Sequence, residues 1–134
     1  MNNVLIVHTS WYEKHISQMI KVSSEILSNN FKCFTAKAPG AIELAALAKN
    51  KLNKNDFVGG IFMGIVIRGE TSHYDLVTQE TFRSIGSLAE NYYDIAIINN
   101  VLCVENENQL IERLLKNTKN NTNELISLID EKSI

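Results

Sequence analysis

The chain has 134 residues, of which 45% are hydrophobic, and its formal net charge is −2 at pH 7. This length predicts one domain, over residues 1–134, with a core that needs neither a disulfide nor a structural metal. The slightly acidic charge argues against nucleic acid or an anionic membrane surface as a partner. No apolar run reaches the roughly 18 residues that a membrane span requires.

The cysteines and the start of the chain indicate the compartment. Cys33 and Cys103 fall within runs that predict strands, where an isolated thiol usually acts as a small buried hydrophobe. The start, Met1 to Val4, lacks the basic stretch and the cleavage site of a secretory signal. We therefore expect reduced thiols and a cytoplasmic protein.

The first part of the chain alternates strand and helix patterns. The continuous apolar run Val4 to His8 predicts a buried parallel strand. Apolar residues then recur at helical spacing from Ile16 to Leu27. Phe31 to Lys37 predicts a second strand, with the weaker apolar content of a sheet edge. Pro39 forces an extended link, after which Ile42 to about Leu52 predicts a short helix.

The middle of the chain predicts a strand, a turn and a long helix. Phe57 to Met63 is an apolar run typical of a strand that is buried on both faces. The residues from Gly64 to Ser72 are expected to form the turn, and apolar spacing predicts a helix from His73 to about Asn91. This strand and helix continue the alternation of the first part.

The last part predicts one more strand and two helices. Asp94 to Val104 reads as a fourth strand, interrupted by Asn99-Asn100. A helix begins at Glu107, and the asparagine-rich stretch Asn117 to Asn123 predicts a break before a last helix from Glu124 to about Lys132. Alternating strands and helices indicate an α/β fold, a three-layer α/β/α arrangement around a parallel sheet.

The turn before the long helix concentrates polar side chains between Arg68 and His73. The hydroxyl of Thr71 or Ser72 can cap the helix, and the free N–H groups and helix dipole there suit an anion. Ligands of open parallel sheets bind at the carboxyl ends of the strands, where this turn must lie. The pattern fits a phosphate or carboxylate site beside His73, or only a capped helix with a surface histidine.

Three motifs carry a resemblance to a known family. The run Gly64 to Asp75 (GIVIRGETSHYD) resembles the signature of the 6,7-dimethyl-8-ribityllumazine synthases. Pro39 to Leu44 (PGAIEL) resembles the family's Pro-Gly-Ala-aromatic-Glu segment, and Glu107 to Arg113 (ENQLIER) resembles its helix with a Glu-Arg pair. The resemblance implies a flavodoxin-like sheet of four parallel strands in the order 2-1-3-4.

The resemblance also implies a transferase of riboflavin biosynthesis. Such an enzyme condenses 5-amino-6-(D-ribitylamino)uracil with 3,4-dihydroxy-2-butanone 4-phosphate, and inorganic phosphate and water are released. No metal and no redox cofactor take part. The family's sites are shared between subunits, which implies a homo-oligomer, at least a pentamer. Because the chain begins at its first core strand, we expect an isolated pentamer rather than a 60-subunit shell.

Residue roles follow from the matching motifs. The resemblance implies that His73 transfers protons, a task that suits an imidazole, and that Arg113 pairs with the phosphate. Trp11 would stack on the pyrimidine, although it could instead be a hydrophobic staple. Glu43 would bind the ribityl hydroxyls, although it could simply favour its helix start. The phosphate-binding turn would comprise Gly69, Glu70 and Thr71. Further substrate contacts are expected from Ala41, Ile42, Val66, Ile67 and Asn99.

The sequence also departs from the family pattern. Asn99-Asn100 stands where phenylalanine-glycine is usual, Leu114-Leu115 replaces alanine-glycine, and Trp11-Tyr12 replaces phenylalanine-asparagine. A second hypothesis is therefore a diverged relative that binds a lumazine or flavin without turnover. A flavodoxin fits poorly because only Thr9-Ser10 would serve as its phosphate loop, and a phosphoreceiver would need an aspartate ending the first or third strand.

Overall fold

Four parallel strands form one sheet at the centre of the computed structural model, which describes residues 1–134. In chain order the strands are β1 (Asn2–Thr9), β2 (Phe31–Ala38), β3 (Gly59–Ile67) and β4 (Ala96–Val104). Their order across the sheet is β2-β1-β3-β4, and every neighbouring pair is parallel. The predicted α/β class and strand order are confirmed.

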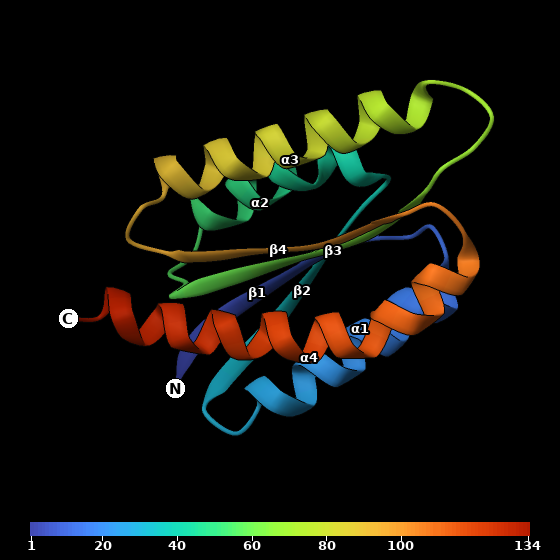
Figure 1. Ribbon diagram of the computed structural model, residues 1–134. Helices are drawn as coiled ribbons and strands as arrows, with labels where there is room; N and C mark the ends of the chain where they lie inside the picture. The colour runs from blue at the N-terminus through green and yellow to red at the C-terminus, as the bar shows by residue number, and fades with distance from the viewer.

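Helices cover both faces of this sheet. Helices α1 (Glu13–Leu27) and α4 (Glu107–Lys132) lie on one face. The short 3-10 turn η1 (Ala41–Glu43) and helices α2 (Leu44–Leu52) and α3 (His73–Asn91) lie on the other, which gives the three layers of Figure 1. None of these helices combines the length and the apolar composition that crossing a bilayer requires.

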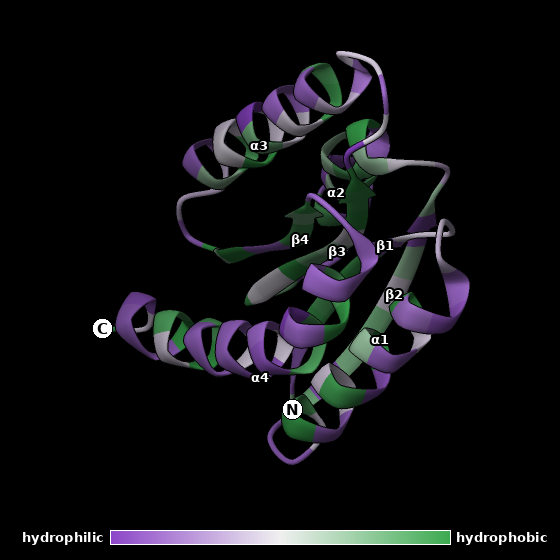
Figure 2. Ribbon diagram, turned by 45° about the vertical axis from the view of Figure 1, so that its right-hand side comes forward, coloured by the Kyte–Doolittle hydropathy of each residue, from purple (hydrophilic) through white to green (hydrophobic).

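Two apolar cores hold the layers together, one on each face of the sheet. Ile6 and Ile61 point toward α1 and α4, whereas Leu5 and Phe62 point toward α2 and α3. Successive strand residues face opposite ways, so a strand buried on both faces must be apolar throughout. This is why β1 and β3 read as continuous apolar runs, and Figure 2 shows these strands between helices whose outer faces are largely hydrophilic.

Helix α4 lies especially close to the start of β3. A Cβ atom on Gly59 would come within 2.9 Å of the Cδ1 atom of Ile129 and 3.0 Å of that of Leu125. The missing side chain at Gly59 therefore allows the helix to pack directly on the strand backbone.

Strand β3 is longer at its carboxyl end than the sequence predicted. Its pairing with β1 stops at Met63, but its pairing with β4 continues to Ile67, opposite Val104. The end predicted at Met63 was therefore wrong, because Gly64 is accommodated in the ladder instead of starting the turn. The turn begins at Arg68, five residues beyond Met63, the last residue paired with β1.

The interruption predicted in the fourth strand was also wrong, because β4 runs without a break through both asparagines. Asn100 is only 1% exposed, and its amide donates to the Oγ1 atom of Thr118 at 3.0 Å. The Oδ1 atom of Asn100 accepts from the side-chain amide of Asn121 at 2.7 Å. Since these bonds satisfy its polar atoms, the asparagine can occupy the middle of a strand.

The break predicted in the last helix was wrong for a related reason. Helix α4 is continuous over 26 residues because the asparagine-rich stretch also carries Thr118 and Thr122, both fully buried. The hydroxyl of Thr122 donates to the carbonyl of Thr118 at 2.7 Å and lies 2.5 Å from the hydroxyl of Ser23 in α1. The composition of this stretch did not reveal that two threonines form its buried face within helix α4.

We expect Asn100→Ala to lower the free energy of unfolding by about 2–3 kcal/mol, because the buried Thr118 and the half-buried Asn121 lose their hydrogen bonds. Denaturant unfolding at fixed protein concentration would measure this change. Asn120→Ala is the control, since Asn120 is an exposed asparagine of the same helix, and its effect should stay within about 0.5 kcal/mol. Equal effects of the two substitutions would contradict the role of the buried network.

Candidate functional site

A cavity of about 300 Å³ lies where three loops meet at the carboxyl edge of the sheet. The loops follow β1, β2 and β3, and the neighbouring strands β1 and β3 are the point where the strand order reverses. Such a switch point is where open α/β sheets bind ligands. The lining residues are Trp11, Tyr12, Gly40, Ala41, Ile42, Glu43, Ile65, Val66, Ile67, His73 and Val77.

The first two loops bring an aromatic ring and a carboxylate together beside Gly40. A Cβ atom at Gly40 would lie 3.1 Å from the Oε1 atom of Glu43 and 4.0 Å from the Nε1 atom of Trp11. Because Gly40 has no side chain, both groups can approach the same piece of backbone. Trp11 is 66% exposed, so its indole is not buried as a hydrophobic staple. The arrangement offers a flat apolar surface next to an acceptor of hydrogen bonds.

The end of β3 and the start of α3 form the opposite wall of the cavity. Ile65, Val66 and Ile67 line it beyond the point where β1 pairing stops. His73 is the first residue of α3 and is exposed, and Val77 follows it one helical turn later. A ligand between these walls would therefore contact unpaired strand backbone, an imidazole and two aromatic rings.

The turn between β3 and α3 borders the cavity without lining it. The Oγ1 atom of Thr71 accepts from the backbone N–H of His73 at 3.2 Å. Ser72 occupies the N-cap position, but its side chain makes no capping hydrogen bond, so Thr71 is the hydroxyl that serves this helix start. The exposed residues Gly69 and Glu70 complete the turn. Its N–H groups lie at the positive end of a 19-residue helix, where an anion is favoured.

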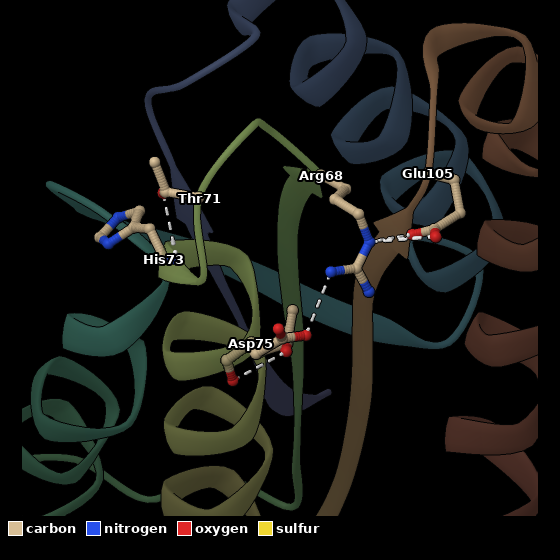
Figure 3. Close-up of polar contacts among 6 residues, drawn as sticks. Arg68, Thr71, His73, Asp75 and Glu105 are labelled. Carbon is tan, nitrogen blue, oxygen red and sulfur yellow. Dashed lines mark hydrogen bonds and ion pairs between the residues drawn. The ribbon is translucent and has the colours of Figure 1, made fainter.

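Arg68 holds the outer side of this turn (Figure 3). Its Nε atom donates to both carboxylate oxygens of Glu105 at 2.8 and 3.0 Å, and its Nη1 atom donates to Asp75 at 3.2 Å. The guanidinium also lies over the ring of Tyr74, 4.2 Å from its centre. The hydrogen bonds with Glu105 raise the pKa of Arg68 above its usual value. Figure 3 shows His73 on the opposite side of the turn from this cluster.

Arg113 and Asn99, like the residues of the turn, do not line the cavity of their own chain. Arg113 lies on the exposed side of α4, where its Nη1 atom donates to the carbonyl of Gln109 at 3.4 Å. Asn99 lies within β4, and its Oδ1 atom accepts from the N–H of Val101 at 2.9 Å. Arg113 forms no ion pair with a carboxylate, so its guanidinium is free to meet an anion.

Four lining residues were not among the expected site residues: Tyr12, Gly40, Ile65 and Val77. Gly40 stands within the Pro-Gly-Ala motif and Val77 one helical turn after His73, so spacing could have identified both. Ile65 lies two residues before Ile67 on the same face of β3. Tyr12 follows Trp11 at a position where the family pattern usually has asparagine, so the resemblance marked the position without assigning a role to a tyrosine there.

A second, more open hollow of about 330 Å³ lies between α3 and β4. Its lining is mostly apolar and includes Tyr74, Phe82 and Cys103. Burial raises the pKa of the Cys103 thiol to about 11, so the thiol is neutral near physiological pH. No three His, Cys, Asp or Glu side chains come together in the chain as a metal site would need.

Comparisons with known proteins identify one family. Residues 2–130 match the family model described as 6,7-dimethyl-8-ribityllumazine synthase. A protein of that name from Bartonella tribocorum is 37% identical over 120 residues, 88% of this chain and 79% of the relative. One from Sphingopyxis alaskensis is 35% identical over 121 residues, 89% of this chain and 84% of the relative. One from Neisseria gonorrhoeae is 39% identical over 102 residues, 73% of this chain and 64% of the relative.

We expect Arg68→Ala to loosen the turn, because the ion pairs with Glu105 and Asp75 are lost. Amide hydrogen exchange of residues 69–72 should accelerate about two- to fivefold, the range of an exposed ion pair. Arg83→Ala is the matched control, since Arg83 forms an exposed ion pair with Glu80 elsewhere on α3. High salt should narrow the difference between wild type and Arg68→Ala. Unchanged exchange in the turn would show that Arg68 does not hold it.

Proposed function

We infer that the chain, which belongs to the 6,7-dimethyl-8-ribityllumazine synthase family, condenses 5-amino-6-(D-ribitylamino)uracil with 3,4-dihydroxy-2-butanone 4-phosphate in riboflavin biosynthesis. The observation that supports this most is the convergence of Trp11, Glu43 and His73 on one cavity beside a helix-start anion site. The proposed reaction proceeds through an imine, loss of phosphate, ring closure and loss of water, without a metal or redox cofactor.

We propose that the first two loops bind the aminopyrimidine. Trp11 would stack on its ring, since an exposed indole at a cavity wall can cover a flat heteroaromatic. The carboxylate of Glu43, beside Ala41 and Ile42, would accept hydrogen bonds from the ribityl hydroxyls. The unpaired backbone at Val66 and Ile67 would bind the polar edge of the ring, because β1 no longer occupies that side of β3.

His73 is the proposed proton-transfer residue. The reaction needs a proton moved when the amine attacks the ketone and again when phosphate leaves. His73 is the only histidine lining the cavity, and its backbone N–H is fixed by Thr71 at 3.2 Å. This hydrogen bond fixes the backbone of His73 at the helix start, next to the turn where the phosphate would leave.

The phosphate would be held from two directions. The N–H groups of the turn formed by Gly69, Glu70 and Thr71 favour an anion at the start of α3. Arg113 would supply the counter-charge from a neighbouring subunit, because its own cavity does not contain it. Asn99 would likewise act on the neighbour's substrate. Both assignments require that adjacent copies pack edge to edge.

Exposed apolar side chains support such an assembly. Leu76 and Phe82 on α3 and Ile111 and Leu115 on α4 are all large, hydrophobic and exposed in the isolated chain. Large exposed apolar side chains on both outer layers suit contacts with other copies of the chain. We propose a closed ring of at least five chains, since a contact between unlike surfaces must close to avoid a filament.

The free thiols of Cys33 and Cys103 fit a cytoplasmic location, which we also propose.

Turnover is the direct test of the proposed function. Purified protein mixed with both substrates should form the fluorescent lumazine faster than the spontaneous reaction. His73→Ala should lower kcat about 100-fold, the lower end of general acid–base effects. Arg113→Ala should instead raise KM for the butanone phosphate, and inorganic phosphate should no longer compete with it.

Arg83→Ala is the matched control for these variants, because Arg83 is an exposed arginine outside the cavity. Its kinetics should equal those of the wild type. Ligand-induced thermal shifts with no product would favour the second hypothesis, a lumazine- or flavin-binding relative without turnover. Wild-type rates equal to those of a His73→Ala and Arg113→Ala double variant would refute the proposed catalysis.

Light scattering tests the proposed assembly. A mass of about 75 kDa fits a ring of five chains of 15.1 kDa, and about 0.9 MDa fits a shell of sixty. Mixing His73→Ala subunits with Arg113→Ala subunits should give more activity than either variant alone, because some sites then receive both intact residues. A fully active monomer near 15 kDa would contradict the shared site.

A further inference from the structure

Tyr12 has the most unusual backbone in the chain. Its φ is 58° and its ψ is 52°, and no other non-glycine residue has a positive φ. In this left-handed region the Cβ atom crowds the following carbonyl, which is why glycine, asparagine and aspartate are preferred there. Strained residues of this kind persist where the surroundings require them, and they gather at binding sites.

The neighbouring helix does not require a tyrosine at this position. Tyr12 is the N-cap of α1, where its carbonyl accepts from the N–H groups of His15 and Ile16, both at 3.0 Å. Its side chain makes no capping hydrogen bond. Since any residue provides a carbonyl, asparagine or glycine would meet the needs of the helix at lower strain.

The ring of Tyr12 serves the cavity instead. It lines the cavity next to Trp11 and remains 44% exposed, so ring surface is open to a ligand. Successive side chains of an extended segment point to opposite sides, yet these two consecutive side chains line the same cavity. The left-handed turn at Tyr12 is the local feature that accounts for this placement.

We propose that Tyr12 is a substrate-positioning residue that forms a second aromatic wall beside Trp11. The ring packs against the heteroaromatic substrate, and the phenol hydroxyl exchanges hydrogen bonds with its polyhydroxylated side chain. The assignment rests on the proposed function, which supplies a pyrimidine with a ribityl chain. The backbone strain is then retained because it directs the ring into the site.

The experiment compares Tyr12→Asn with Tyr12→Phe. Asparagine tolerates the left-handed conformation, so Tyr12→Asn should raise Tm by about 2–4 °C while it removes the ring. The same variant should raise KM for the aminopyrimidine about tenfold and leave KM for the butanone phosphate unchanged. Tyr12→Phe keeps both the ring and the strain, so its Tm should stay constant and its KM should rise only about two- to fivefold.

Binding can be read without turnover, because Trp11 is the only tryptophan of the chain and lines the cavity. Quenching of its fluorescence by the aminopyrimidine alone should weaken in Tyr12→Asn by the same factor as KM. Tyr93→Asn, at an exposed tyrosine outside the cavity, should change neither Tm nor quenching.

The outcomes separate the two proposals. A wild-type protein that neither turns over nor shows quenching refutes the proposed function itself. A wild type that turns over, with unchanged KM and quenching in Tyr12→Asn, overturns the role of Tyr12 alone. A fall in Tm for Tyr12→Asn would overturn the explanation by backbone strain, and Tyr12→Phe would then still test the contact of the hydroxyl.

Discussion

The unequal pairing of β3 with its two neighbours is the constraint on which the site depends. The strand pairs with β1 only as far as Met63 but with β4 as far as Ile67. Past Met63, β1 has ended at Thr9 and its chain turns away toward α1. One edge of β3 is therefore left open where the strand order reverses. The cavity lies in this gap, so the unequal pairing of the strands itself creates the space for the site.

Much of the fold could be predicted because each face of the sheet is covered. A strand buried on both sides must be apolar at every position, which made β1 and β3 recognisable, and the helices show one apolar stripe each. The errors arose where polar residues are buried. Asn100, Thr118 and Thr122 satisfy one another or nearby groups across β4, α4 and α1, a long-range arrangement that no local pattern reveals.

The sequence allowed us to predict which loops form the site, but not where every site residue lies. Trp11, Glu43 and His73 are separated in sequence, but each follows a parallel strand, and such ends meet at one edge. Arg113 and Asn99 could not be placed in the same way, because a single chain leaves both outside its cavity. The left-handed backbone conformation of Tyr12 could not be predicted either, because local propensity disfavours it for a tyrosine and only the folded loop imposes it.

In the last third of the chain, the residues that depart from the family pattern mainly change how the interior is packed. Asn100 faces α4 and bonds to Thr118 and Asn121, so a polar residue in the strand is matched by polar residues on the helix above it. Such a set changes the interior of the layer that contains α4, and none of its members lines the cavity at the carboxyl edge of the sheet. Only Asn99 faces the α2 and α3 layer, by the alternation of the strand. Of the two asparagines, only Asn99 can therefore affect that layer and favour a relative without turnover.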